Sequence, residues 1–288
     1  MKLVPKGNRI VITGGAKGFG KAMALCFAKA NWRILIADLQ PDHAQSVIDE
    51  LIAAGAQDAY FTQCDITKTE DILKLYNCCM ELWDGIDVLI NNAGVYCGGT
   101  FAELTEDNWA PVIETNLIGT MRVTQQFIHR FQKQKSGRIV NISSLSGVLP
   151  MPGSSAYSIS KAGVFAFSQT LRHELRPYKV GITVAVPNIF PTDIFKDGDI
   201  PNPAIRNSME STMHVSPVTA EDVAQRVYDA VMNDQYMVTT DEGLDYDRYL
   251  DMLDKNLEKF TGDMAAVSKS MKNKVAKPRT KIKSRETA

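Results

Sequence analysis

The sequence predicts an α/β protein built on a doubly wound parallel sheet of about seven strands, with helices on both faces. Two observations lead to this fold class. Short apolar runs rich in β-branched residues alternate with longer segments that are apolar at helical spacing. The apolar runs also end in small or polar residues, which is where a ligand site lies in such a sheet. The alternation is typical of a parallel sheet joined by right-handed helical crossovers.

The expected elements follow from these two periodicities. Strands are predicted at residues 10–12, 33–37, 60–64, 87–90, 138–142, 181–186 and 236–240. Helices are predicted at residues 21–28, 41–54, 69–83, 106–134, 155–178, 219–233 and 246–260. Since no linker rich in Pro, Gly or Ser divides this part of the chain, residues 1–262 are interpreted as one domain. Residues 263–288 are expected to form a basic, disordered tail.

A glycine-rich segment lies where the first strand turns into the first helix. Residues 13–20 read Thr-Gly-Gly-Ala-Lys-Gly-Phe-Gly. Glycines at such a junction allow a tight turn, a close approach of the backbone to a ligand, and close packing of helix on strand. The helix start then offers unpaired N–H groups to a phosphate. We therefore predict a dinucleotide site on the Rossmann pattern, with contacts from Gly14, Lys17, Gly18, Phe19 and Gly20.

Composition and charge exclude several other classes of protein. The net charge is −1, but residues 269–288 carry eight Lys or Arg and one Glu, which leaves the preceding body acidic. An acidic body argues against nucleic acid as the main ligand. No apolar stretch is long enough to span a membrane, although the basic tail allows weak contact with anionic lipid. The five cysteines have no metal-type spacing, so no metal site is predicted, and their odd number favours a cytoplasmic location.

Two charged residues bear on which dinucleotide binds. Asp38 follows the second strand, where a carboxylate accepts hydrogen bonds from the adenosine ribose and repels a 2′-phosphate. Lys17, in the glycine-rich loop, would instead attract that phosphate. Because the clash of like charges outweighs the attraction of a flexible lysine, the sequence favours NAD over NADP.

Tyr157 and Lys161 lie four residues apart at the start of a predicted helix and so share one face. A phenol has an ordinary pKa of about 10, and a neighbouring ammonium group is expected to lower it. The pair is then suited to move a proton to or from a carbonyl or alcohol oxygen. Ser144 follows the fifth strand, thirteen residues earlier, and joins the same predicted site.

Taken in order, these motifs resemble the short-chain dehydrogenase/reductase family in its compact single-domain branch. The resemblance covers roughly residues 7–240. Its markers are the glycine-rich loop, Asp65, the run Asn91-Asn92-Ala93-Gly94, Asn116, Ser144, Tyr157 and Lys161.

The resemblance implies a role for each marker. Tyr157 acts as the acid/base, Lys161 lowers its pKa and holds the nicotinamide ribose, and Ser144 binds the substrate oxygen. Asn116 holds a water that links Lys161 to solvent. The remaining cofactor contacts implied are Leu39, Asp65, Ile66, Asn92, Ala93, Gly94, Tyr157 and Pro187. The family pairs commonly through the helices that carry Asn116 and Tyr157, so a homodimer or homotetramer is expected.

The chain departs from the family pattern after the sixth strand. The family has Pro-Gly there, whereas this chain has Pro187-Asn188, and Asn is the next most tolerant residue of positive φ. Phe190 and Thr192 keep the spacing of nicotinamide carboxamide contacts. Residues 188–216 are predicted to form a loop that covers the substrate. Their apolar side chains favour an apolar substrate.

These features predict an oxidoreductase that transfers a hydride between NAD, or alternatively NADP, and a secondary alcohol or ketone. Two alternatives stay open. A dinucleotide-sensing protein without catalysis is expected to lack the tyrosine or the lysine. An epimerase or dehydratase relative is expected to show a different glycine spacing and to retain its cofactor.

Overall fold

The computed structural model describes residues 2–195, 198–214 and 216–240. The chain divides after Asp241 into two units, and the second, Glu242–Ala288, lies outside the described residues. The predicted helix at 246–260 and the basic tail at 263–288 fall there. The predicted domain limit at residue 262 therefore stays a prediction.

The described part is a seven-stranded sheet in which every neighbouring pair is parallel, in the order β3-β2-β1-β4-β5-β6-β7. This confirms the predicted fold class. The strand order reverses between β1 and β4, and a ligand site is expected at the carboxyl ends of the strands at such a reversal. The strands are β1 (Arg9–Thr13), β2 (Arg33–Asp38), β3 (Asp58–Gln63), β4 (Val88–Asn91), β5 (Arg138–Ile142), β6 (Gly181–Val186) and β7 (Met237–Thr239).

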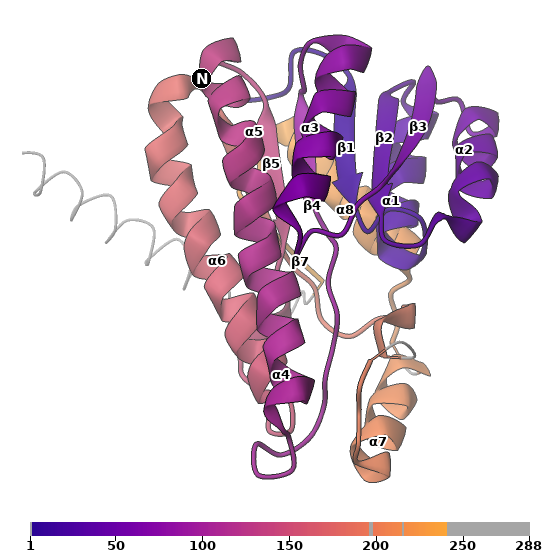
Figure 1. Ribbon diagram of the computed structural model, residues 1–288, viewed down its shortest axis with the longest axis vertical. Coiled ribbons are helices and arrows are strands. Elements are labelled where there is room, and N and C mark those ends of the chain that lie inside the picture. The colour runs from indigo at the N-terminus through magenta and orange to yellow at the C-terminus, as the bar shows by residue number, and fades with distance from the viewer. Residues whose placement is uncertain (1, 196–197, 215, 241–288) are drawn as a thin grey trace, which may run out of the picture. The chain divides into compact units, whose positions relative to one another are not determined.

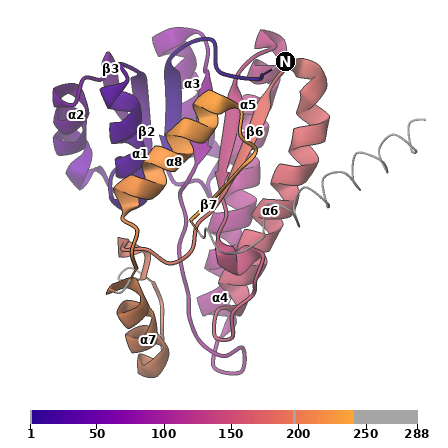
Figure 2. The same cartoon turned by 180° about the vertical axis from the view of Figure 1, so that it is seen from behind.

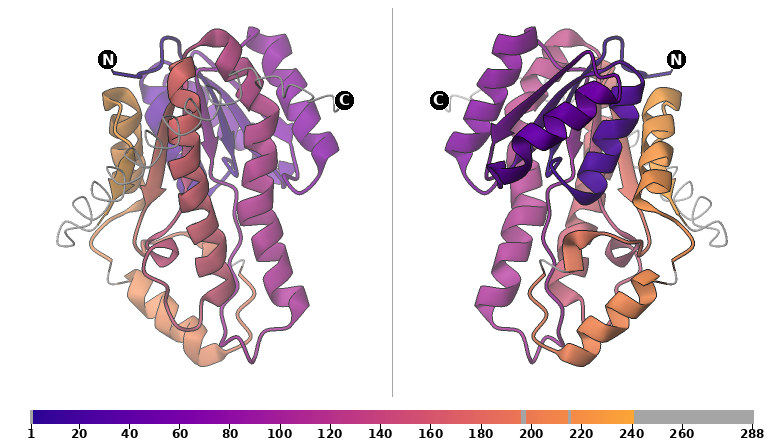
Figure 3. Two further views of the ribbon diagram at one scale, coloured as in Figure 1. Left: turned by 90° about the vertical axis from the view of Figure 1, so that its left-hand side faces the viewer. Right: turned by 90° about the vertical axis from the view of Figure 1, so that its right-hand side faces the viewer.

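Helices cover both faces of the sheet, as Figures 1 and 2 show from opposite sides and Figure 3 from the two edges. One face packs on α1 (Gly18–Lys29), α2 (Ala44–Ala53) and α8 (Ala220–Asn233). The other packs on α3 (Thr69–Trp83), α5 (Thr120–Gln134) and α6 (Ser155–Leu175). Side chains of successive residues in β1 point to opposite faces of the sheet. Ile10 and Ile12 pack in the core beneath α1, α2 and α8, and Val11 packs in the core beneath α3, α5 and α6. Both faces are thus apolar, as the uninterrupted apolar strands predict.

The predicted helix at 106–134 is continuous but contains a π-helical turn. It consists of α4 (Glu106–Ile113), a π-helical turn (Glu114–Gly119) and α5. A π turn inserts an extra residue into the helix and is frequent at functional sites. Asn116 lies in this turn.

One helix in the predicted covering loop was missed. Within residues 188–216 the structure has a short 3-10 turn (Asp193–Phe195) and α7 (Pro203–His214). This segment lies beyond the carboxyl ends of the strands, together with the start of α4 (Figure 1). The cover is therefore partly helical rather than an irregular loop.

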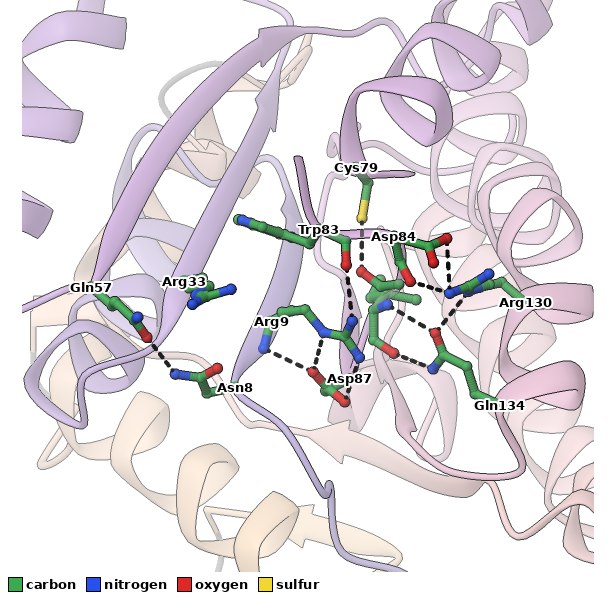
Figure 4. Close-up of polar contacts among 12 residues, drawn as sticks. Asn8, Arg9, Arg33, Gln57, Cys79, Trp83, Asp84, Asp87, Arg130 and Gln134 are labelled. Carbon is green, nitrogen blue, oxygen red and sulfur yellow. Dashed lines mark hydrogen bonds and ion pairs between the residues drawn. The ribbon is translucent and has the colours of Figure 1, made fainter. Parts of the chain in front are cut away.

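Buried and half-buried arginines anchor the opposite, amino edge of the sheet. Arg9 pairs with Asp87 at 2.7 Å, and Gln134 of α5 donates to the Ile86 carbonyl at 2.7 Å (Figure 4). Arg138 is fully buried. It pairs with Asp234 and donates to the Leu3 carbonyl at 2.7 Å. These contacts pair the Arg9 guanidinium and the two terminal nitrogens of Arg138, whereas the buried Arg138 Nε has no hydrogen-bond partner.

Candidate active site

The glycine-rich turn adopts the geometry that its sequence predicts. Gly14 has φ +62°, and an added Cβ would lie 2.8 Å from the Ala93 Cα. At Gly20 an added Cβ would lie 2.0 Å from the Gly14 carbonyl oxygen. Gly18 has φ +52° with no neighbouring atom within 4 Å of such a Cβ. Lys17, which precedes α1, does not cap the helix with its side chain. Backbone N–H groups in the first turn of a helix are suited to bind a phosphate, and the predicted contacts at this turn stay predictions.

Asp38 closes β2 directly beside this turn and is buried. Its Oδ2 accepts from the Ala16 N–H at 3.0 Å, and its Oδ1 accepts from the Gln40 N–H at 3.3 Å. Leu39, the next residue, is 56% exposed. The carboxylate is therefore oriented by the loop backbone, and an apolar side chain stands next to it.

The Asn91–Gly94 run joins the glycine-rich turn to β4. The Thr13 hydroxyl accepts from the N–H groups of Asn92 and Ala93 at 3.0 and 3.1 Å. The Asn92 amide donates to the carbonyls of Thr13 and Gly14 at 3.1 and 2.8 Å. The Asn92 side chain is thus used to hold two loops together, and it is the Ala93–Gly94 backbone that borders the site.

Asp65 and Ile66 follow β3 in a turn. The Asp65 carboxylate accepts from the Thr67 N–H and hydroxyl at 2.9 and 2.7 Å and pairs with Lys68 at 3.4 Å. Burial raises the pKa of Asp65, but these donors outweigh burial and hold the pKa below its ordinary value. Ile66 is buried. Both side chains shape the turn, and their predicted contact with adenine stays a prediction.

Asn116 reaches from the π turn to the segment after β4. Its Oδ1 accepts from the Val95 N–H at 2.8 Å, and its Nδ2 donates to the Val95 carbonyl at 2.9 Å and to the Ser160 hydroxyl at 3.1 Å. An added Cβ on Gly94 would lie 3.1 Å from the Asn116 Oδ1 and 3.6 Å from the Lys161 Nζ. Asn116 and Lys161 therefore meet at Gly94.

Tyr157, Ser144 and Lys161 come together as predicted. Ser144 follows β5, and its hydroxyl lies near enough to the Tyr157 phenol to lower the pKa of that phenol. The Lys161 Nζ lies 5.6 Å from the centre of the Tyr157 ring and donates to the Ile142 carbonyl at 2.8 Å. The site thus gathers a phenol, a hydroxyl and an amine at the ends of β4 and β5.

The pKa values correct one expectation. Burial raises the pKa of Tyr157 to about 12, and the nearby Ser144 hydroxyl only partly opposes it. Burial also lowers the pKa of Lys161 to about 8. Lys161 is not among the causes that set the pKa of the phenol, which lies above its ordinary value. The main cause is burial of the phenol, and the Lys161 Nζ donates to the Ile142 carbonyl.

The segment after β6 corrects another expectation. The Pro187 carbonyl accepts from the Leu145 N–H at 2.9 Å, and the Asn188 N–H donates to the Thr240 hydroxyl at 2.8 Å. Asn188 is not among the described residues with positive φ, so the turn does not need the tolerance expected of Asn. Phe190 is buried edge-on against Phe19, with ring centres 5.1 Å apart.

The cover and the site share an apolar cluster. Tyr96, Phe195, Ile200 and Met213 are buried together, and Tyr157 and Ile189 pack against them. Thr192 is half-buried at the start of the cover, and its predicted contact with the carboxamide stays a prediction. Tyr96 and its partner Ser154 were missed from the sequence. The only available signal was the position of Tyr96, two residues beyond the Asn-Asn-Ala-Gly run.

Two negative findings complete the site. No helix in the described ranges is both long and apolar enough to cross a membrane. Within those same ranges, no three His, Cys, Asp or Glu side chains are arranged to hold a metal ion.

A doubly wound sheet with a glycine turn after β1 and polar groups at the strand ends defines a dinucleotide-type α/β protein. Residues 8–200 match the family model for short chain dehydrogenases. The chain therefore belongs to the short-chain dehydrogenase/reductase family of oxidoreductases, as its motifs indicate.

Individual relatives support this assignment. Over 194 residues the chain is 33% identical to the 3-oxoacyl-(acyl-carrier-protein) reductase FabG of Aquifex aeolicus, covering 67% of this chain and 78% of that protein. It is also 33% identical over 185 residues to the 3-oxoacyl-(acyl-carrier-protein) reductase of Synechocystis, covering 64% and 74%. A solved short-chain dehydrogenase/reductase from Burkholderia phymatum in complex with NAD matches with a TM-score of 0.79 at 26% identity. That match covers 90% of this chain and 96% of the other.

Lys161 gives the first testable prediction. Its pKa is about 8 in the fold and 10.5 in an ordinary lysine, so between these pH values the unfolded chain binds more protons than the native one. Stability therefore rises with pH across this window. Relative to Lys161→Met, we expect the wild type to gain about 2 kcal/mol in unfolding free energy from about pH 7 to about pH 10. Urea unfolding of both proteins at the two pH values measures the gain. Parallel curves would show that the native amine keeps its ordinary pKa.

Proposed function

We propose that this chain is an NAD(P)-dependent oxidoreductase that interconverts a ketone and a secondary alcohol, with Tyr157 as the acid/base. The observation that carries the proposal is the meeting of Ser144, Tyr157 and Lys161 at the strand ends next to the glycine-rich turn. Family membership and the NAD complex of the Burkholderia phymatum relative support it.

The residues present fit a nicotinamide dinucleotide. The turn excludes side chains at Gly14 and Gly20, and the open start of α1 suits a pyrophosphate. Asp38 and Leu39 would border the adenosine ribose, Ala93 and Gly94 the middle of the cofactor, and Lys161 the nicotinamide ribose. When bound, the cofactor supplies the hydride acceptor or donor.

The chain's own groups handle the proton. Because the pKa of Tyr157 is about 12 in the cofactor-free protein, the phenol is protonated at neutral pH and ready to donate to a carbonyl oxygen. The Ser144 hydroxyl, which lies near the Tyr157 phenol, would donate a hydrogen bond to the substrate carbonyl oxygen and stabilise the negative charge that develops on it. Asn116 links Ser160 to the segment at Val95, and we propose that it holds a water that would connect the Lys161 amine to solvent.

We infer an apolar substrate, because the cover packs Phe195, Ile200 and Met213 toward Tyr157. The named activity of the Aquifex aeolicus and Synechocystis relatives, reduction of a 3-oxoacyl group, belongs to the same ketone class. A non-catalytic dinucleotide sensor is not favoured, since the tyrosine and the lysine are both in place. The expected homodimer or homotetramer and cytoplasmic location form part of this proposal.

A spectrophotometric screen tests the proposal. The purified protein is mixed with NADH or NADPH and a panel of apolar ketones, and the near-ultraviolet absorbance of the reduced cofactor is followed. The proposal expects cofactor oxidation with at least one ketone and the matching alcohol as product. Tight cofactor binding without turnover across the panel would support the sensor instead.

Cofactor preference gives a second prediction. Because the buried Asp38 carboxylate repels a 2′-phosphate, we expect tighter binding of NAD than of NADP. Asp38→Ser should reduce that preference by about tenfold to a hundredfold, as one lost charge repulsion predicts. Titration by fluorescence gives both dissociation constants. Lys17→Met serves as the comparison and should weaken NADP alone. Unchanged preference in Asp38→Ser would assign selectivity to another group.

A further inference from the structure

Tyr96 is the middle member of a row of three aromatic rings in the candidate site. Its ring centre lies 5.0 Å from that of Tyr157 and 4.7 Å from that of Phe195, with the Phe195 ring edge-on. Its side chain is 3% exposed. The ring therefore stands between the proposed acid/base and the segment that covers the substrate.

The ring is held from its hydroxyl end. The Tyr96 hydroxyl lies 2.7 Å from the Ser154 hydroxyl, and Ser154 directly precedes α6, the helix that carries Tyr157. At Gly98 an added Cβ would lie 2.9 Å from the Tyr96 ring, so the chain leaves room for the ring there. Burial raises the pKa of Tyr96 to about 12, against the opposing effect of the bond to Ser154. The hydroxyl therefore stays neutral and occupied in this bond.

The backbone around Tyr96 is fixed on two further sides. The Asn116 amide binds both the N–H and the carbonyl of Val95. On the other side, the Tyr96 carbonyl accepts from the Asp199 N–H at 3.0 Å, and the Asp199 carbonyl accepts from the Gly98 N–H at 3.0 Å. Tyr96 therefore cannot move independently of the cover or of the π turn.

We propose that Tyr96 is a specificity-determining residue, whose ring is the wall that limits the size of one substituent on the reacting carbon. This inference rests on the proposed function. The reacting oxygen must contact the Tyr157 phenol, so a substituent directed toward the cover meets the Tyr96 and Phe195 rings. A wall fixed at hydroxyl and backbone does not yield easily, and well-packed sites resist added volume.

Two aryl methyl ketones test this wall, because they differ only in the size of one substituent. Acetophenone carries one ring and 2-acetonaphthone two. The measured quantity is the ratio of kcat/KM for 2-acetonaphthone to kcat/KM for acetophenone, with the same reduced cofactor. Tyr96→Leu removes the wall and is expected to raise this ratio about tenfold, within the range that pocket volume provides.

Two variants control the experiment. Tyr96→Phe keeps the ring without its hydroxyl and should leave the ratio close to that of the wild type. Tyr178→Leu makes the same change in the turn after α6, at a half-exposed site, and should leave the ratio unchanged. Cofactor affinity is measured on every variant, since Tyr96 is placed against the substrate and not the cofactor.

Each outcome of the experiment either supports or overturns the proposal that Tyr96 limits the size of the substrate. A raised ratio in Tyr96→Leu alone supports the proposal. Equal loss or gain with both ketones, or a Tyr96→Phe protein that behaves like Tyr96→Leu, overturns the wall while leaving the proposed function intact. A wild-type protein that oxidises reduced cofactor with no ketone of the panel, these two included, overturns both. Should Tyr96→Leu not fold, Tyr96→Trp is used, and the enlarged ring is expected to lower the ratio.

Discussion

Tyr157→Phe is expected to lower kcat for ketone reduction by about a thousandfold, the middle of the range for loss of a positioned general acid. The substitution removes the hydroxyl that we propose donates to the substrate oxygen. The ring itself remains, so its packing with Tyr96 is preserved. Cofactor affinity is therefore expected to fall far less than kcat. Steady-state kinetics together with a cofactor titration separate the two quantities.

Tyr76→Phe is the matched control for that loss. Tyr76 lies in α3 and packs edge-on against Phe127, with ring centres 5.3 Å apart, in the core on one face of the sheet. Removing its hydroxyl should leave kcat unchanged. If Tyr157→Phe retained wild-type turnover, the proton would have to come from another group, and the assignment of Tyr157 as acid/base would be wrong.

Gly20→Ala is expected to destabilise the protein by about 3 kcal/mol and to weaken cofactor binding about a hundredfold. The new Cβ would lie 2.0 Å from the Gly14 carbonyl oxygen and 2.6 Å from the Asn92 amide nitrogen. The start of α1 must then move away from β1, which displaces the N–H groups proposed to bind the pyrophosphate. Thermal unfolding without cofactor and a cofactor titration measure the two effects.

Gly18→Ala separates space from backbone conformation. Here an added Cβ has no neighbour within 4 Å, and only the φ of +52° opposes a side chain. The expected cost in the cofactor-free protein is about 1 kcal/mol, which is the penalty of the left-handed region alone. Equal destabilisation by the two substitutions would mean that close packing of α1 on β1 is not what requires glycine at position 20.

Local signals account for what the sequence predicts well. Apolar runs such as Ile10-Val11-Ile12 and Gly181–Val186 mark buried strands, and the glycines at 14, 18 and 20 mark a strand–helix turn, because both depend on neighbours in the chain. The meeting of Ser144 with Tyr157 follows from the sheet topology, which brings strand ends to one edge. These parts of the site needed no knowledge of distant contacts.

Long-range contacts account for what was missed. The bond from Tyr96 to Ser154 joins residues 58 positions apart, and nothing in the local pattern of either residue announces it. The Lys161 ammonium was expected to act on Tyr157, but a carbonyl on β5 competes for it. The helix α7 was missed although the sequence held a local signal for it. Pro203 stands at its first position, where proline commonly begins a helix.

The arginines at the amino edge of the sheet place the ion pairs that anchor the strands at the end opposite the candidate active site. Their ion pairs hold β1, β5 and the loop after α8 in place at the end of the sheet remote from the candidate chemistry. Ser144, Tyr157 and Lys161 take no part in these ion pairs, so we expect substitutions at those three positions to leave the anchoring of the strands intact. Residues near the N-terminus, in contrast, take part in this anchoring. Since the Leu3 carbonyl accepts from a fully buried guanidinium, even the first few positions of the chain belong to the scaffold.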